Sequence, residues 1–154
     1  MKSQKNRQYK RLTLAQYVRR RNGVALGASG SLRNMLYRSL GAATFAGFWR
    51  YWNPVWGYGL GKYIFAPLKR VFPSIVALIM TFVFSGLLHD LAIIMIKGSI
   101  VFIFTPWFFL LGVGVVLAEA IGINFTSKPW GYRASINMIY LTICYVLSRI
   151  AISF

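Results

Sequence analysis

Three long apolar stretches occupy the second half of the chain, over about residues 73–96, 99–121 and 136–154. Each has the length that a helix needs to cross the hydrocarbon core of a bilayer. Pro73 suits the first turn of a helix, whereas Pro106 lies inside the second stretch and predicts a kink there. The pattern therefore predicts three transmembrane helices, joined by a short reversal and by a polar loop.

Basic and polar positions predominate in the first forty residues. Residues 1–21 are expected to be mobile or to lie on lipid headgroups, and the glycine-rich residues 23–31 predict a linker. After the linker, positions 32, 35, 36 and 40 are apolar at helical spacing, while Arg33 and Arg38 lie off that stripe. This is typical of an amphipathic helix in the membrane interface. We therefore expect residues 1–40 to form a basic, partly flexible arm that carries an amphipathic helix.

Residues 41–70 are rich in aromatic side chains and glycine. Trp and Tyr concentrate at the membrane interface because each joins an apolar ring to a polar group. Pro54 and Gly57 break the segment too often for it to span a bilayer, so we expect an interfacial or re-entrant arrangement. Together with the three predicted spans, this segment forms a membrane domain over residues 41–154.

The composition agrees with a membrane protein. Hydrophobic residues make up 57% of the chain and charged residues 13%, and the mean hydropathy is +0.56. A soluble domain of this length would need far more polar surface. The expected fold class is an all-α integral membrane protein.

The charge is strongly asymmetric, with 18 Lys and Arg against 2 Asp and Glu. Most of the cations precede the first apolar stretch, which is the pattern that the positive-inside rule associates with a cytoplasmic N-terminus. The expected location is a bacterial inner membrane, with the endoplasmic reticulum membrane as the alternative. Anionic headgroups account for the basic arm, so we expect a lipid bilayer as its partner and no nucleic acid.

The chain has one histidine, His89, which falls inside the first predicted span. Polar side chains inside a membrane helix usually face a cavity or a partner. Ser85 precedes His89 by one turn and shares its helix face, whereas Asp90 is rotated away. A neutral imidazole suits general base chemistry near neutral pH. A structural imidazole that bonds to a neighbouring helix is the alternative.

No metal site is expected, because the chain has no second histidine and its two carboxylates, Asp90 and Glu119, lie far apart in the sequence. The single cysteine, Cys144, excludes an internal disulfide and a zinc cluster.

Two motifs stand on either side of a basic connector. The segment FWRYWN covers residues 48–53, and the segment FSGLLHD covers residues 84–90. Together with YIFAPLKR over residues 63–70, they resemble the membrane-bound O-acyltransferase family, which includes sterol and diacylglycerol acyltransferases and a wax-synthase-like branch. The resemblance covers about residues 45–122.

The resemblance implies that His89 is the catalytic histidine and Asn53 its partner. It also implies transfer of an acyl group from a thioester, usually acyl-CoA, to a hydroxyl, with no bound cofactor. His89 would then remove the proton of the acceptor, and the amide of Asn53 would orient the acceptor or polarise the carbonyl. An asparagine before Pro54 that only caps a turn is the alternative. Candidates for contact with CoA phosphates are Arg50, Lys62, Lys69 and Arg70, although flanking charge explains them equally well.

The family usually has more spans than the three predicted here. We therefore expect a homo-oligomer, or a second membrane subunit that supplies further helices. The leading hypothesis is an acyl-CoA-dependent enzyme. The alternative is a reduced family member that acts as a non-catalytic membrane subunit or scaffold.

Overall fold

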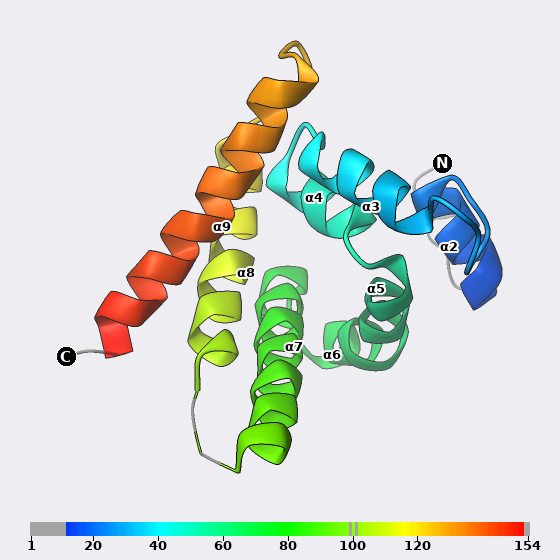
Figure 1. Ribbon diagram of the computed structural model, residues 1–154. Helices are drawn as coiled ribbons and strands as arrows, with labels where there is room; N and C mark the ends of the chain where they lie inside the picture. Colours follow the sequence, from blue (N-terminus) through cyan, green and yellow to red (C-terminus); the bar gives the residue numbers. More distant parts are fainter. Residues whose placement is uncertain (1–11, 99, 101, 153–154) are drawn as a thin grey trace.

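The computed structural model describes residues 12–98, 100 and 102–152, and every regular element among them is a helix (Figure 1). In chain order the elements are α2 (Leu14–Asn22), α3 (Ser31–Leu40), α4 (Phe45–Tyr51), α5 (Pro54–Leu60), the π-helix η1 (Gly61–Phe65), α6 (Ala66–Val71), α7 (Ser74–Lys97), α8 (Phe104–Ala120) and α9 (Trp130–Ile152). This confirms the predicted all-α class.

The long helices α7, α8 and α9 lie side by side, with α8 between the other two (Figure 1). Of the described helices, α7 and α9 are long and apolar enough to cross a membrane, with apolar stretches over Ser74–Lys97 and Trp130–Ala151. The middle helix has only 17 residues. At about 1.5 Å per residue it is shorter than the hydrocarbon core of a typical bilayer. The second of the three predicted spans is therefore shorter than expected.

Asp90 explains where α8 begins. Its carboxylate accepts hydrogen bonds from the backbone N–H groups of Ile103, Phe104 and Thr105 at 2.8–2.9 Å. These amides are among the unsatisfied donors at a helix N-terminus, and the anion stabilises the helix start there. The predicted kink at Pro106 is wrong, because this residue lies in the first turn of α8, where a missing N–H breaks no helical hydrogen bond.

The third apolar helix begins six residues earlier than predicted, at Trp130 rather than at 136. Hydrogen bonds to α3 and its C-terminal end fix this first part of α9. The indole of Trp130 donates to the carbonyl of Tyr37 at 2.9 Å, and the amide of Asn137 donates to the carbonyls of Leu40 and Ala42. The end of α3 is thereby attached to the N-terminal half of α9.

The N-terminal arm is more ordered than the sequence analysis expects, since residues 14–22 form helix α2. Thr13 caps this helix, and Val18 and Asn22 are buried. The amide of Asn22 donates to the hydroxyl of Ser31 at 2.7 Å, which joins α2 to α3. Residues 1–11 lie outside the described part of the chain. The division into an arm and a membrane domain at residue 40 stays a prediction.

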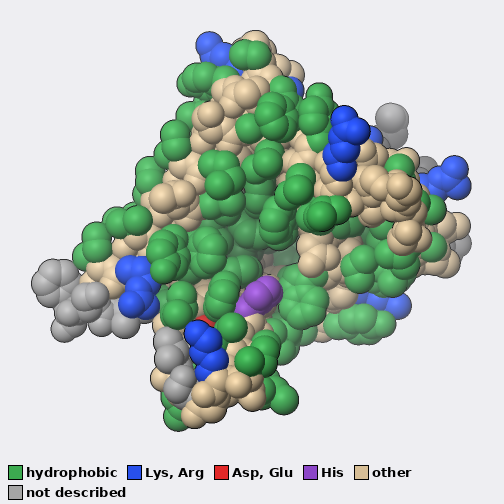
Figure 2. Space-filling model, in the orientation of Figure 1, with side chains coloured by type: hydrophobic (Ala, Val, Ile, Leu, Met, Phe, Trp, Pro, Cys, Tyr) green, Lys and Arg blue, Asp and Glu red, His purple; other side chains and the backbone are tan. Residues whose placement is uncertain are grey.

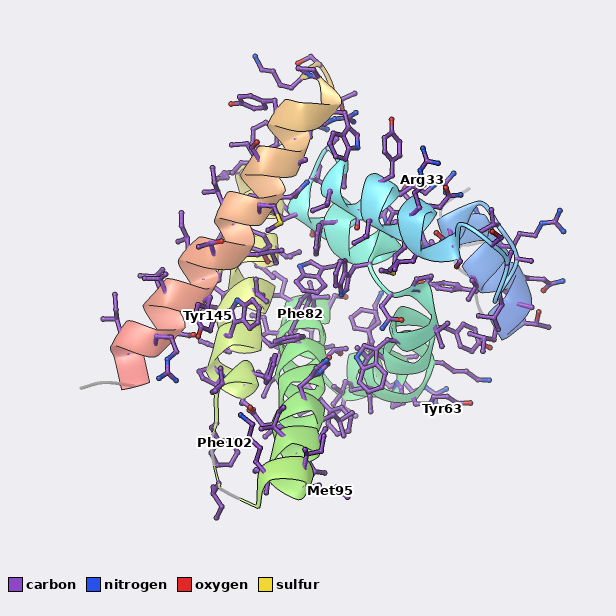
Figure 3. All side chains as sticks on the ribbon, in the orientation of Figure 1. Arg33, Tyr63, Phe82, Met95, Phe102 and Tyr145 are labelled. Carbon is purple, nitrogen blue, oxygen red and sulfur yellow. The ribbon has the colours of Figure 1, made fainter. Side chains whose placement is uncertain are left out.

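Helix α3 occupies the position predicted for an amphipathic helix. Its polar residue Ser39 is buried, whereas the apolar residue Leu32 is 67% exposed and Tyr37 is 62% exposed. Arg33 extends from the outer side of the same helix (Figure 3). A helix that turns apolar side chains outward suits a membrane interface better than an aqueous surface.

Helices α4 to α6 complete the fold, with α4 against α8, and with η1 and α6 against α7. Helix α4 packs on α8 and α9 through Trp49 and Phe45, whose rings contact Phe108 and Tyr140. Helix α5, η1 and α6 follow one another without a break, because the residues at both junctions keep helical dihedral angles. Hydrophobic side chains cover much of the surface over the long helices (Figure 2), including Met138, Ile139, Ile143, Val146, Leu147 and Ile150 of α9.

Candidate active site

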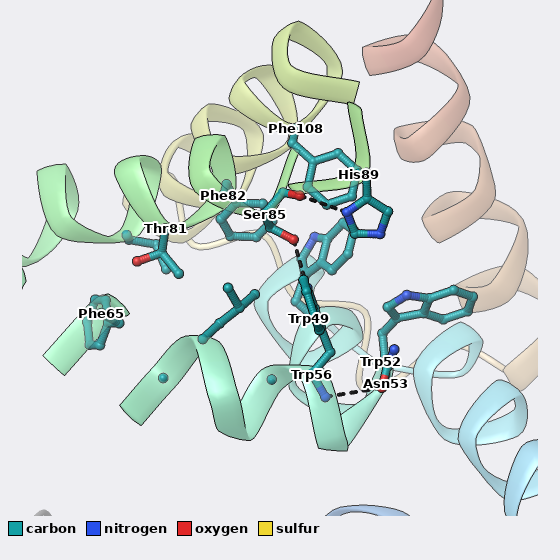
Figure 4. A pocket seen from close by; sticks show the side chains of 14 residues that line it. Trp49, Trp52, Asn53, Trp56, Phe65, Thr81, Phe82, Ser85, His89 and Phe108 are labelled. Carbon is teal, nitrogen blue, oxygen red and sulfur yellow. Dashed lines mark hydrogen bonds between the residues drawn. The ribbon is translucent and has the colours of Figure 1, made fainter. Parts of the chain in front are cut away.

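A pocket of about 240 Å³ lies between α7 on one side and α4, α5 and η1 on the other (Figure 4). Both residues that the sequence analysis selected, His89 and Asn53, line this pocket. In Figure 4 they lie toward one end, whereas Thr81 and Phe65 lie toward the other. The remaining lining residues are mostly apolar: Trp49, Trp52, Trp56, Gly57, Leu60, Gly61, Leu78, Phe82, Ser85 and Phe108.

The imidazole of His89 is held in one orientation by its own helix. Its Nδ1 lies 2.7 Å from the carbonyl oxygen of Ser85, one turn earlier in α7. Because a carbonyl only accepts hydrogen bonds, Nδ1 carries the proton and Nε2 carries the lone pair of the neutral ring. Aromatic rings surround the imidazole, with the centroids of Trp56, Phe104 and Phe108 at 5.2–5.8 Å. The bond is to the same helix and not to a neighbouring one, and it leaves a basic nitrogen without a hydrogen-bond partner in the described part of the chain.

Asn53 caps helix α5 and has an uncommon backbone conformation. Its φ angle is 37°, and it is the one non-glycine residue with positive φ among those described. The side-chain Oδ1 accepts a hydrogen bond from the backbone N–H of Trp56 at 3.2 Å. This assigns the other amide atom as Nδ2, whose two N–H groups have no partner among the described residues. The capping role and the donor role are therefore compatible, because they use different atoms of the amide.

The aromatic walls come from three helices. The indole of Trp49 meets Phe82 edge-on at 5.1 Å, and Figure 3 shows Phe82 between the helices rather than on the outer surface. Phe82 thus lines the pocket, whereas Phe84 and Met80 of the same helix are each 38% exposed and do not line it.

The cationic candidates lie outside the pocket lining. Arg50, Lys69 and Arg70 are exposed residues near the C-terminal ends of α4 and α6. The ammonium of Lys69 lies 5.8 Å from the centroid of Phe65, which is a lining residue, so this cation is at the Phe65 end of the pocket. Lys62 is fully exposed, and its contacts with Tyr63 and then Tyr58 raise its pKa, which keeps it cationic.

The remaining ionisable residues named in the sequence analysis lie outside the pocket lining. Asp90 turns away from the pocket, as the helical rotation predicts, and holds the start of α8. Cys144 is buried against Leu111 and Val115, and Glu119 is exposed near the end of α8. The described residues contain no group of three or more His, Cys, Asp or Glu side chains that could hold a metal ion.

Sequence reasoning missed Trp56 and Thr81 as residues of the site. Thr81 could have been found, because it precedes Ser85 and His89 at intervals of four residues and so shares their helix face. Trp56 gives no such signal. Its indole Nε1 donates to the hydroxyl of Ser85 at 2.9 Å, across a sequence separation of 29 residues.

The fold and the pocket together define a helical membrane protein that brings a basic imidazole and an amide donor to one apolar site. The comparison with family models then supplies the family. The model of MBOAT, the membrane-bound O-acyltransferase family, matches residues 21–153, and the chain belongs to this family. No curated protein and no solved structure matches the chain. Family membership confirms the resemblance and extends it beyond residues 45–122, and it indicates membrane-bound O-acyltransferase activity.

Proposed function

We propose that this protein transfers an acyl group from acyl-CoA to a hydroxyl acceptor, with His89 as the general base and Asn53 as the amide donor. The observation that carries the proposal is the placement of both side chains on one pocket, although 36 residues separate them in the sequence. Family membership supplies the reaction class. The geometry supports the assignment of Nε2 of His89 and Nδ2 of Asn53 to the reaction.

In the proposed reaction, Nε2 of His89 accepts the proton of the acceptor hydroxyl. The hydroxyl oxygen attacks the carbonyl carbon of the thioester at the same time. The tetrahedral intermediate then collapses and its C–S bond breaks. The imidazolium returns the proton to the departing thiolate, which yields an ester and free CoA thiol. The hydrogen bond from Nδ1 to Ser85 supports this role, because it keeps Nε2 unprotonated in the neutral ring.

In this proposal Asn53 stabilises the developing oxyanion through a hydrogen bond. Negative charge grows on the carbonyl oxygen during the attack, and an N–H donor already fixed in place stabilises it. The Nδ2 group meets this requirement, since Oδ1 is engaged with the backbone N–H of Trp56 and fixes the amide plane. Met35 adds a second restraint through its sulfur atom, which accepts from the backbone N–H of Asn53 at 3.3 Å.

The apolar part of the pocket is proposed to hold the acyl chain. It runs from the imidazole toward Phe65 and Thr81, between η1 and α7 (Figure 4). An engineered apolar cavity of about 150 Å³ binds one benzene ring, so a pocket of about 240 Å³ has room for part of an acyl chain beside the reacting groups.

The proposed membrane orientation places the N-terminus on the cytoplasmic side. The loops before α7 and between α8 and α9 then lie on that side with Lys69, Arg70 and Lys128, while Lys97 lies on the other. Anionic headgroups would contact the basic helices α2 and α3 and the exposed Lys69 and Arg70. A protease site fused before residue 1 tests the orientation, because it should be cut in inside-out vesicles and protected in right-side-out ones.

The same proposal includes a partner that encloses the pocket with further helices. The exposed apolar faces of α7 and α9 suit lipid, a second copy of the chain or another membrane subunit. Crosslinking in native membranes distinguishes these occupants. A monomer with full transfer activity would exclude the need for a protein partner.

The test of the function is a transfer assay with the purified chain in proteoliposomes. Labelled acyl-CoA of different chain lengths is supplied with lipid, sterol and sugar hydroxyl acceptors. The proposal expects labelled ester and an equal amount of free CoA thiol. Thiol release without ester would mean transfer of the acyl group to water and would overturn the proposed acceptor. No reaction with any pair would leave the non-catalytic subunit as the better account.

A further inference from the structure

The side chain of Trp56 connects the two halves of the candidate active site. Its helix, α5, begins directly after Asn53, and the facing helix, α7, carries His89. We propose that Trp56 is a positioning residue, which holds the amide of Asn53 and the imidazole of His89 in a fixed relation across the pocket. This inference rests on the proposed acyl transfer, and it concerns a residue that neither motif of the sequence contains.

Three hydrogen bonds that involve Trp56 and Ser85 support the assignment. The backbone N–H of Trp56 donates to Oδ1 of Asn53, and the indole Nε1 of the same residue donates to the hydroxyl of Ser85 at 2.9 Å. The carbonyl of Ser85 in turn accepts from Nδ1 of His89 at 2.7 Å. Figure 4 shows these bonds linking Asn53 to His89 through Trp56 and Ser85.

The bond between Trp56 and Ser85 has no substitute nearby. Among the described residues it is the one side-chain hydrogen bond that joins α5 to α7. Ser85 is 2% exposed, so water does not compete freely for its hydroxyl. A buried donor or acceptor that loses its partner costs more than an exposed one, and this resists any displacement of α5 along α7.

Trp56 also contacts the imidazole directly. Its ring meets that of His89 edge-on, with centroids 5.8 Å apart and planes at 84°. The indole thus limits rotation of the imidazole, while its N–H fixes the helix that begins at Asn53. A displacement of about 1 Å between reacting groups reduces an enzymatic rate by as much as about a hundredfold, so a residue with both contacts is expected to affect the rate through the positions of Asn53 and His89.

The first part of the test compares Trp56→Phe with Ser85→Ala. Each removes one partner of the bond, and Phe retains an aromatic ring beside His89. We expect kcat to fall about tenfold in either variant with KM changed less than about twofold, and the double variant to be no slower than the singles. Additive losses, or a rise in KM with unchanged kcat, would overturn the positioning role.

Trp107→Phe is the matched control. Trp107 also donates its indole N–H in a helix contact, to the carbonyl of Leu141 at 3.1 Å, but it does not line the pocket. Its loss should lower the unfolding temperature and leave kcat close to that of the parent protein. If Trp107→Phe lowered kcat as much as Trp56→Phe, the effect of Trp56 would be general helix packing.

The second part needs no activity and separates this inference from the proposed function. His89 is the only histidine, so its imidazole nitrogen resonances in labelled protein need no assignment by mutation. Trp56→Phe and Ser85→Ala should both move these resonances, and Ser85→Ala should also shift the indole N–H signal that Trp56→Phe removes. If the parent protein transfers no acyl group, the proposed function fails and these shifts alone decide the Trp56 contact. Unchanged imidazole and indole signals would overturn the inference, whatever the activity.

Discussion

The hydroxyl and the backbone N–H of Thr105 both donate to the same carboxylate oxygen of Asp90, at 2.6 and 2.8 Å. With the N–H groups of Ile103 and Phe104, the buried carboxylate accepts four hydrogen bonds from the first turn of α8. These bonds compensate an anion that is 1% exposed inside an apolar helix pair. They also determine where the middle helix begins.

Asp90→Asn should therefore destabilise the protein. An amide replaces one acceptor oxygen with a donor, which faces backbone N–H groups and leaves at least one of them unpaired. We expect a loss of about 1–3 kcal/mol in the free energy of unfolding, measured by denaturant titration in detergent micelles. Glu119→Gln, at an exposed position, is the control and should change little. Equal stability of Asp90→Asn and the parent protein would contradict the role of Asp90 as the cap of α8.

Substitutions at Asn53 separate its cap from its donor. Asn53→Asp keeps an oxygen for the N–H of Trp56 and tolerates the left-handed backbone conformation, but it has no N–H groups to offer. We expect its unfolding temperature to stay near that of the parent protein while transfer falls by about a hundredfold. Asn53→Ala should lower both quantities. Full activity of Asn53→Asp would show that Asn53 only caps the helix.

The glycine at position 61 is expected to set the length of acyl chain that the pocket accepts. Gly61 lines the pocket, has ordinary helical dihedral angles, and a Cβ built there meets no atom within 4 Å. Gly61→Leu should fold and should shift the preferred acyl-CoA toward shorter chains, measured as kcat/KM over a series of donors. Gly59→Leu is the control, because a Cβ there is equally free but the residue does not line the pocket. An identical shift in both variants, or none in Gly61→Leu, would exclude this assignment.

Helical periodicity allowed part of the site to be predicted. Ser85 and His89 share a face because they are one turn apart, and Asp90 points elsewhere because it is the next residue. These relations are local, so the sequence determines them once α7 is recognised. The target of Asp90 could not be predicted, since the start of α8 depends on a contact between two helices rather than on its own residues.

The motif residues could be identified from the sequence, whereas the long-range contacts could not. The resemblance assigned Asn53 and His89, and family membership supports the reaction class, but no spacing rule predicts that Trp56 bonds to Ser85. The left-handed backbone conformation of Asn53 could not be predicted either, because asparagine before proline adopts several turn conformations. The ends of α8 and α9 also depended on tertiary contacts, through Asp90 and through Trp130.

The most direct test of the account is the rate of acyl transfer by His89→Ala in proteoliposomes, measured beside the parent protein with the same labelled acyl-CoA and hydroxyl acceptor. Met80→Ala, on an exposed face of the same helix, controls for general effects of substitution in α7. Loss of a general base should lower transfer by about a hundredfold to ten-thousandfold in His89→Ala, while Met80→Ala stays near the parent rate. Equal transfer by His89→Ala and the parent protein, both folded and inserted, would contradict the central claim that this imidazole is the base.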